Sequence, residues 1–331
     1  MKRRVLRTGL QLTEIGMGAA QFGNLNRTTT DEASVAAVDA AWQAGIRYFD
    51  TAPHYGLGLS ERRLGAALAG RPRAEYVVST KVGRLLVPSP ETADRLDDQG
   101  FAVPADHRRV WDFSRDGVLR SLEQSLERLG TDRIDIVYVH DPDEHEAEAL
   151  DGAIPALVEL REQGVIGSVG AGMNQSAMPA RFIERSDLDV IMLAGRYTLH
   201  EQGALEDLLP AASARGVGIV AAAVYNSGLL AAPVVPDDAH YDYGPAPADV
   251  LEHARALAVA CEEYGITLPD AAVAFPLRHP SVVSVVVGAR TATHILGTVS
   301  RYTTEIPGGF WRELVERGLL RSDAPSEAQS A

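Results

Sequence analysis

The amino-acid sequence predicts an α/β protein with the architecture of a (β/α)₈ TIM barrel, formed as a single domain. Two observations predict this fold: eight short apolar runs alternate with eight runs of helical periodicity, and the apolar runs are nearly continuous. Continuous apolar strands are typical of parallel sheets that are buried on both faces. Eight regular units in 331 residues fit a closed barrel better than an open doubly wound sheet.

The order of the elements follows from these runs and their boundary residues. The predicted strands are 14–20, 46–50, 76–81, 134–140, 166–172, 188–194, 217–223 and 282–288. The predicted helices are 31–44, 60–69, 114–129, 146–163, 175–185, 203–215, 248–264 and 291–301. Thr30 and Ser114 are placed to cap helix N-termini, and a glycine such as Gly130 or Gly216 follows several helices, as helix ends favour.

Two long βα loops interrupt the repeat, 83–113 after the third strand and 230–247 after the seventh. Loops of this length are usually functional or disordered, and both follow strand carboxyl ends, where barrels build their active sites. We assign 1–320 to the barrel domain. The polar segment 321–331 is predicted to be a disordered tail.

Composition excludes several classes of function. The formal net charge of -14 argues against nucleic-acid or anionic-membrane partners. The longest apolar stretches are too short to cross a bilayer, and the start of the chain lacks a signal-peptide core, so we expect a cytoplasmic protein. Cys261 is the sole cysteine; it lies in an amphipathic run, which indicates a buried structural thiol rather than a nucleophile.

Three polar residues end predicted strands that neighbour one another: Asp50, Lys81 and His140. Because the carboxyl ends of barrel strands meet at one face, we expect these side chains to converge. A carboxylate next to Lys81 keeps the lysine charged, and this charge favours the ionised form of a nearby phenol. Tyr55, in the loop after Asp50, is the candidate phenol for proton transfer. His140 can then hydrogen-bond and orient a carbonyl or alcohol oxygen.

Lysine is rare in this chain: of 31 basic residues, only Lys2 and Lys81 are lysines. The arginine bias indicates that Lys81 has a role that a bulkier, forked guanidinium does not fulfil. Its amine can activate a phenol or form a Schiff base with a carbonyl substrate, and composition does not separate these roles.

The stretch GIRYFDTAPHYGLGLSERRLGAAL at 45–68 resembles the signature of the aldo-keto reductases, and the resemblance extends from residue 5 to about residue 305. It implies a (β/α)₈ barrel that moves hydride between NAD(P) and a carbonyl or alcohol. The catalytic tetrad of that family corresponds to Asp50, Tyr55, Lys81 and His140.

Further stretches, at 193–210, 224–231, 241–257 and 275–289, resemble one branch of the family, the D-threo-aldose 1-dehydrogenases or L-fucose dehydrogenases. This resemblance implies oxidation of the anomeric carbon of an aldose to a lactone, with Tyr55 as general acid/base. Pyridoxal, or another aldehyde or alcohol, is the alternative substrate. A Schiff-base aldolase using Lys81 and a non-catalytic nucleotide-sensing subunit are alternatives of other classes.

Cofactor positions are also implied by the resemblance. Asn174 corresponds to the ligand of the nicotinamide amide, and Ser227 with its neighbouring backbone N–H groups to the pyrophosphate loop. Where many relatives have a glutamine and a tyrosine for the nicotinamide, this chain has Ala194 and Ala222. The full predicted cofactor set is Gly18, Ala20, Asp50, Asn174, Ser227, Gly228, Gly288, Arg290, His294 and Thr298.

At the adenosine end, Gly288 and His294 occupy the positions of the lysine and arginine that hold the 2′-phosphate in NADP-specific relatives. Arg290 can substitute, since guanidinium pairs well with phosphate, although an ordinary surface charge is the alternative. NAD is therefore slightly favoured over NADP.

The predicted substrate residues are His54, Trp111, Tyr225 and Asn226, which combine aromatic surface with polar groups and suit a small sugar or aldehyde. For Trp111, a packing role within the long loop is the equal alternative. The cluster HDPDEH at 140–145 contains metal-binding residue types, but Pro142 breaks its spacing, and no metal is predicted.

Overall fold

A computed structural model describes residues 1–242 and 244–325 of the chain. Eight parallel strands close into a barrel in the order β10-β11-β14-β3-β4-β5-β8-β9. These strands are β3 (Ile15–Gly18), β4 (Tyr48–Asp50), β5 (Val77–Val82), β8 (Ile134–His140), β9 (Ile166–Met173), β10 (Val190–Ala194), β11 (Gly218–Ala222) and β14 (Val282–Gly288). All eight predicted strands are confirmed, with ends within two residues of those expected.

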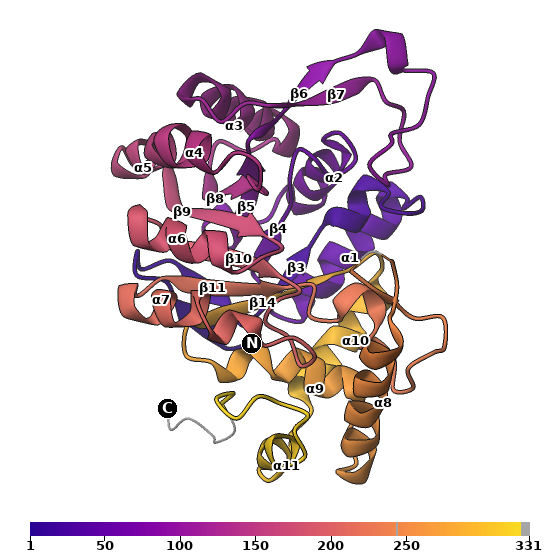
Figure 1. Cartoon of the computed structure of the whole chain (residues 1–331). Coiled ribbons are helices and arrows are strands. Elements are labelled where there is room, and N and C mark those ends of the chain that lie inside the picture. Colours follow the sequence, from indigo (N-terminus) through magenta and orange to yellow (C-terminus); the bar gives the residue numbers. More distant parts are fainter. Residues whose placement is uncertain (243, 326–331) are drawn as a thin grey trace.

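Helices cover the outside of the barrel, as Figure 1 shows. The helices that follow the barrel strands are α1 (Asp31–Gln43), α2 (Leu59–Leu68), α3 (Arg115–Leu129), α4 (Glu146–Glu148) with α5 (Ile154–Glu162), α6 (Ala177–Arg185), α7 (Leu208–Arg215), α8 (Ala248–Glu263) with α9 (Leu268–Ala274), and α10 (Ala292–Thr303). Thr30 and Ser114 cap α1 and α3 through their side chains, as predicted. The main apolar core lies between the strands and these helices.

Inside the barrel, a smaller apolar cluster fills the space below the strand carboxyl ends. Two buried tyrosines meet there, from β4 and β8, the two strands that flank β5. Tyr48 Oη lies 3.0 Å from Tyr138 Oη and 3.1 Å from Ser79 Oγ. Ser79 Oγ in turn donates to Asp50 Oδ1 at 2.6 Å. A polar chain within the barrel floor therefore supports the residue that ends β4.

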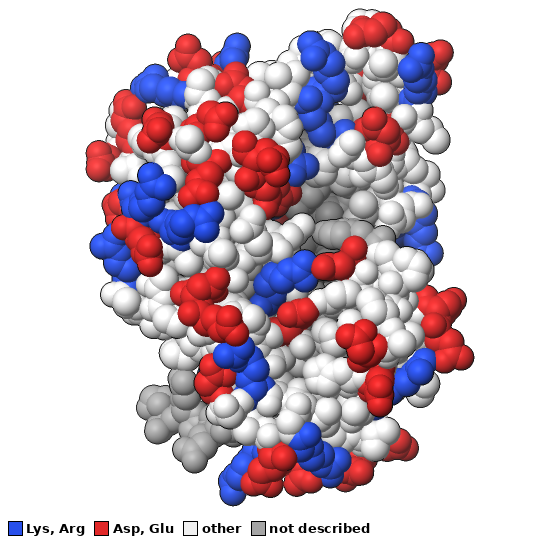
Figure 2. Space-filling view, viewed as in Figure 1, with Lys and Arg blue, Asp and Glu red and all other residues white. Residues whose placement is uncertain are grey.

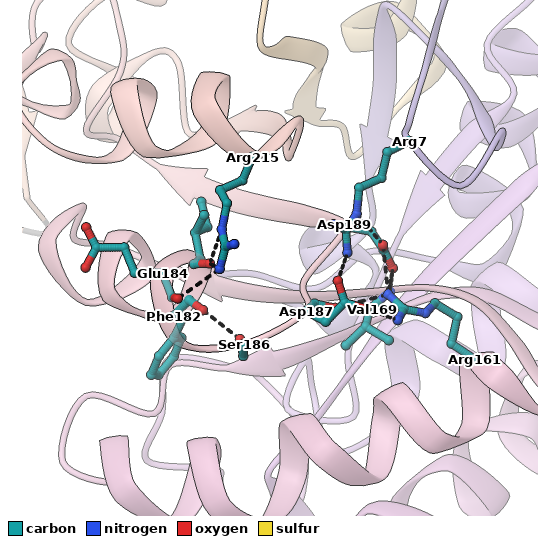
Figure 3. A network of polar contacts seen from close by, with 10 residues as sticks. Arg7, Arg161, Val169, Phe182, Glu184, Ser186, Asp187, Asp189 and Arg215 are labelled. Carbon is teal, nitrogen blue, oxygen red and sulfur yellow. Dashed lines mark hydrogen bonds and ion pairs between the residues drawn. The ribbon is translucent and has the colours of Figure 1, made fainter.

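The amino-terminal end of the barrel is closed by a hairpin that the sequence did not predict, formed by β1 (Arg3–Val5) and β2 (Gln11–Thr13). Arg7 anchors it by pairing with Asp187 and, at 2.8 Å, with Asp189 (Figure 3). Asp189 is almost fully buried and also accepts from Arg161 and from the backbone N–H of Val169. This ion cluster ties the hairpin to the strand ends.

The long loops contain structure of their own. In 83–113, β6 (Arg84–Pro88) pairs with β7 (His107–Trp111) as a hairpin that projects from the barrel in Figure 1. In 230–247, β12 (His240–Tyr241) pairs with β13 (Gly244–Pro245). A helix that was not predicted, α11 (Phe310–Glu316), follows the last barrel helix and packs against α8.

The first residues of the predicted tail make contacts with the rest of the chain. Ala324 is 4% exposed, Arg278 Nε donates to the backbone oxygen of Pro325 at 2.8 Å, and Arg321 pairs with Asp323. Residues 321–325 are therefore packed, because these contacts compensate for their polar sequence, and the prediction of a tail starting at 321 is wrong for them. Residues 326–331 lie outside the described part of the chain.

Surface charges of both signs lie interspersed over the face drawn in Figure 2. Across the described residues, no helix combines the length and the apolar character that a membrane span requires.

Candidate active site

The carboxyl ends of β4 and β5 bring Asp50 and Lys81 into contact. Lys81 Nζ donates to Asp50 Oδ1 at 2.9 Å, to Asp50 Oδ2 at 2.7 Å and to the backbone oxygen of Thr51 at 2.9 Å. Burial lowers the pKa of Lys81, but the charges of Asp50 and Tyr55 oppose it and the net pKa is raised. The lysine therefore stays an ammonium held in one place.

Tyr55 lies above this pair, with its ring centroid 4.9 Å from Lys81 Nζ. Its loop is placed by a close approach of two glycines: a Cβ on Gly56 would lie 2.2 Å from the backbone oxygen of Gly23, and Gly56 has φ of 62°. A larger residue at Gly56 would push the Tyr55 loop away from the lysine.

The pKa of Tyr55 is raised, because burial of the phenol outweighs the opposing charge of Lys81. Lys81 lowers the pKa of Tyr55, as expected, but the net pKa is higher than that of a free tyrosine, whereas the sequence suggested a readily ionised phenol. Desolvation was not visible in the sequence. The resting side chain is a neutral phenol that can donate a proton, and the charge of Lys81 beside it stabilises the phenolate that forms when the proton leaves.

Two histidines complete this side of the site. The His140 ring lies 5.9 Å from that of Tyr55 and 5.6 Å from that of His54. Burial, together with the charge of Arg84, lowers the pKa of His140 well below its ordinary value. The same two causes lower the pKa of His54 to about 2. Both rings are therefore neutral, and His140 can donate a hydrogen bond without carrying charge.

A cavity of about 530 Å³ opens over these residues, a volume within the range of small-molecule sites. It brings together nine of the predicted residues: Gly18, Ala20, Asp50, His54, Tyr55, Lys81, His140, Asn174 and Gly288. Ala194 and Ala222 also line this cavity. These are the two positions where many relatives have the glutamine and the tyrosine that contact the nicotinamide.

Other predicted residues lie outside this cavity. Trp111 is 46% exposed and stacks on Phe113, with ring centroids 5.7 Å apart. Tyr225 Oη accepts from Arg301 at 2.8 Å, and Asn226 is buried with its Nδ2 donating to the Gly195 oxygen. The structure does not bring these three into contact with the tetrad, and their role in substrate binding stays a prediction.

The turn after β11 contains the predicted pyrophosphate loop. Asn226, Ser227 and Gly228 have φ of 44°, 58° and 100°, a few residues after Ala222 and Ala223, which line the cavity. The N–H groups of Asn226 and Gly228 already donate to the backbone oxygens of Ala223 and Tyr225, at 2.9 and 3.0 Å. Phosphate binding by this turn stays a prediction.

Arg290 is engaged with the chain itself. Its guanidinium donates to the backbone oxygens of Leu25 and Arg27, at 2.7 and 2.8 Å, and to Thr29 Oγ1. The backbone N–H of Arg290 donates to His294 Nδ1 at 3.3 Å, and Thr298 Oγ1 donates to the His294 oxygen. Arg290 therefore holds the loop after β3, which borders the cavity at Leu25.

Several residues of the site were not predicted. Arg84 and Asp141 form an ion pair beside His140, at 2.6 Å, and Ser79 supports Asp50. Gln21 lines the cavity next to Gly288, and its buried Oε1 has no hydrogen-bond partner among the described residues. Asp141 was visible within HDPDEH, but that cluster was considered only for metal binding.

Polar groups and small side chains make this cavity suited to a nicotinamide dinucleotide. Gln21 Oε1 is a buried polar atom of this cavity without a hydrogen-bond partner among the described residues, and Gly18, Ala20, Ala194 and Ala222 leave room along the wall. The residues present fit such a group, with Asn174 and Gln21 at the cavity wall available for polar contacts. Within the described chain, no group of three or more His, Cys, Asp or Glu side chains is arranged for a metal ion.

Comparison with known proteins decides the family. The model of the Aldo/keto reductase family matches residues 14–316. The chain belongs to this family. It is 48% identical over 315 residues to a D-threo-aldose 1-dehydrogenase of Pseudomonas sp., covering 94% of this chain and 96% of the relative. It is 39% identical over 336 residues to a pyridoxal 4-dehydrogenase of Microbacterium luteolum, covering 96% and 98%.

Among solved structures, the holo form of an aldo-keto reductase from Bacillus halodurans superposes with a TM-score of 0.77 at 25% identity, covering 98% of each chain. These comparisons confirm the barrel, the aldo-keto reductase resemblance and the conclusion that this protein is an oxidoreductase.

Cys261 lies buried in α8, and burial raises the pKa of its thiol to about 12, which agrees with a structural role.

Proposed function

We propose that this aldo-keto reductase oxidises the anomeric carbon of an aldose to a lactone, with Tyr55 as general acid/base. The observation that carries the proposal is the buried Lys81–Asp50 pair beside Tyr55 and His140 at one end of a single cavity. The 48% identity to a protein named D-threo-aldose 1-dehydrogenase supports the substrate class.

Each side chain of the tetrad has a separate role in the proposed reaction. His140, neutral and buried, donates a hydrogen bond to the hydroxyl oxygen on the anomeric carbon and orients it. Tyr55, as phenolate, removes the hydroxyl proton while the C–H bond of that carbon breaks and its C=O bond forms. Lys81 stabilises the phenolate, and Asp50 keeps the ammonium in place. When bound, the nicotinamide cofactor supplies the acceptor for the hydride.

Residues of this chain are also proposed for the cofactor. Asn174 is assigned to the carboxamide, and the turn that contains Ser227 and Gly228 to the pyrophosphate. NAD is slightly favoured, since the guanidinium of Arg290 already donates to the loop after β3 and Gly288 offers no cation for a 2′-phosphate. Gly18, Ala20, His294 and Thr298 remain proposed neighbours of the cofactor.

A second candidate is oxidation of pyridoxal or another alcohol or aldehyde. The relative named pyridoxal 4-dehydrogenase favours it, and so do the rings at the mouth, where His54 and Phe101 meet edge to face with centroids 5.2 Å apart. An aromatic substrate could pack against this surface.

The test is a panel of aldoses, pyridoxal and simple aldehydes, each assayed with NAD and with NADP by the absorbance of the reduced nicotinamide. Lactone formation from an aldose, identified by mass spectrometry, is the expected result. Turnover of pyridoxal alone would support the second candidate. Trapping of a substrate on Lys81 by borohydride, with no change in nicotinamide absorbance, would support an aldolase, and tight nucleotide binding without any turnover would support a sensing subunit.

A further inference from the structure

A second carboxylate lies at the catalytic end of the cavity, one residue after His140. We propose that Asp141, held by Arg84, binds the hydroxyl on the carbon next to the reacting one and so selects aldoses over their 2-deoxy analogues. The inference rests on the proposed function and adds to it a specificity residue that acts through substrate binding rather than proton transfer.

The backbone of Asp141 is held in an unusual conformation. Asp141 has φ of 41°, and its N–H donates to the backbone oxygen of Gly172 at 3.0 Å. Pro142 follows it, and a residue before proline normally adopts an extended conformation with negative φ. Backbone strain of this kind persists where surrounding structure holds it, and it gathers at functional sites. Asp141 lines the cavity.

Contacts of the carboxylate leave it able to accept further hydrogen bonds. Arg84 Nη2 donates to Asp141 Oδ2 at 2.6 Å, and His140 Nε2 lies 3.5 Å from the same oxygen. Among the described residues, no group donates a hydrogen bond to Oδ1. An ionised carboxylate accepts about four hydrogen bonds. The Asp141 carboxylate can therefore accept further hydrogen bonds from a substrate.

Arg84, the partner of this carboxylate, is itself in contact with an aromatic ring. Its guanidinium lies over the Trp111 ring, 4.6 Å from the centroid, and its buried Nε has no hydrogen-bond partner among the described residues. Arg84 comes from β6, so the hairpin of the long loop supplies the group that fixes the carboxylate of Asp141. Trp111 therefore supports the guanidinium of Arg84 and acts on the site through that arginine.

The position of Asp141 relative to His140 indicates which hydroxyl it meets. In the proposed mechanism His140 holds the reacting oxygen, and Asp141 Oδ2 lies next to the same imidazole nitrogen. Hydroxyl oxygens on neighbouring carbons of a sugar lie about one hydrogen-bond length apart. A sugar whose anomeric oxygen contacts His140 therefore brings its adjacent hydroxyl within reach of the carboxylate. A 2-deoxy sugar leaves that acceptor unpaired in a desolvated site, which is a strong basis for discrimination.

The test compares L-fucose with 2-deoxy-L-fucose in the wild-type protein and in Asp141→Asn. We expect the wild type to prefer L-fucose in kcat/KM by about 10- to 100-fold, the range of one charge-assisted hydrogen bond. In Asp141→Asn the preference should fall to below about 3-fold, mainly through slower use of L-fucose. A purely structural role for the ion pair would slow both sugars equally and leave the ratio unchanged, and that result would overturn the inference.

Asp143→Asn is the matched control, since it removes the same charge two residues away, from a side chain that is exposed and outside the main cavity. Its ratio should equal that of the wild type. If Asp141→Asn does not fold, as judged by its Tm, Asp141→Glu keeps the charge but displaces the carboxylate, and it should also reduce the ratio. Retention of the full ratio in Asp141→Glu would contradict the inference.

Failure of the proposed function has a different signature. A wild-type protein that oxidises neither sugar while turning over pyridoxal overturns the aldose assignment, and the inference with it. A wild-type protein that oxidises both sugars at the same rate leaves the aldose assignment standing and overturns the inference alone.

Discussion

Lys81 Nζ donates to both carboxylate oxygens of Asp50, at 2.7 and 2.9 Å, and both side chains are buried. An ion pair in this setting fixes the ammonium close to the Tyr55 ring. Removing either partner leaves an uncompensated buried charge, which usually costs about 3–5 kcal/mol of stability. The pair therefore holds the lysine in place and keeps its positive charge next to the phenol of Tyr55.

Replacing Lys81 by methionine should change the pH dependence of oxidation. Oxidation requires the phenolate, and burial already raises the pKa of Tyr55 while Lys81 lowers it, so loss of the lysine raises that pKa further. The wild-type rate should increase with pH through the alkaline range. In Lys81→Met, the increase should begin at higher pH and the rate at neutral pH should fall by about 10²- to 10⁴-fold. The measurement is kcat/KM against pH for both proteins; superimposable profile shapes would contradict this assignment.

The contacts of Arg290 predict how its loss affects cofactor binding. Because the guanidinium donates to the oxygens of Leu25 and Arg27, Arg290→Ala should release the loop after β3. The Kd values of NAD and NADP should then rise by a similar factor, about 3- to 10-fold for the loss of neutral-acceptor hydrogen bonds. Titration by protein fluorescence gives both values. A selective loss of NADP binding would instead show that Arg290 contacts the 2′-phosphate.

Asp189→Asn should destabilise the protein without impairing its chemistry. Asp189 is 1% exposed and accepts from Arg7, Arg161 and the backbone N–H of Val169 (Figure 3). It directly precedes β10, at the amino-terminal end of the barrel, whereas the catalytic residues lie at the carboxyl ends of the strands. Disrupting such a buried charge cluster should lower the free energy of unfolding by about 3–5 kcal/mol. Denaturant unfolding measures this change, and kcat of the folded variant should match the wild type.

Asp187 offers the control for that experiment. It pairs with the same two arginines, but its side chain is 57% exposed. Asp187→Asn should therefore cost only about 0–1 kcal/mol, as expected of surface ion pairs. Equal destabilisation by both variants would mean that burial of Asp189 is not the source of the effect.

Much of the barrel was predictable because its strands are apolar on both faces and its helices are periodic. The convergence of Asp50, Lys81 and His140 followed from the same pattern, since each residue ends a strand. The N-terminal hairpin was missed because β1 and β2 are three residues long each and carry few apolar residues.

Contacts made by loops could not be derived from spacing. Arg84 reaches Asp141 only because β6 and β7 form a hairpin within a segment whose sequence is polar and irregular. Arg290 is similar: its sequence position suggested a phosphate ligand, but its folded position binds backbone oxygens of a loop that is distant in sequence. The raised pKa of Tyr55 could not be predicted either, because it depends on burial of the phenol, which a sequence motif does not reveal.

The central claim concerns Tyr55 as the group that moves the proton. Its most direct test is single-turnover oxidation of L-fucose by Tyr55→Phe, with cofactor Kd measured on the same preparation. Loss of the phenol oxygen should reduce the rate of nicotinamide reduction by about 10²- to 10⁴-fold while the Kd stays within about 3-fold of the wild type. A variant that retains most of the wild-type rate with unchanged cofactor binding would contradict the account.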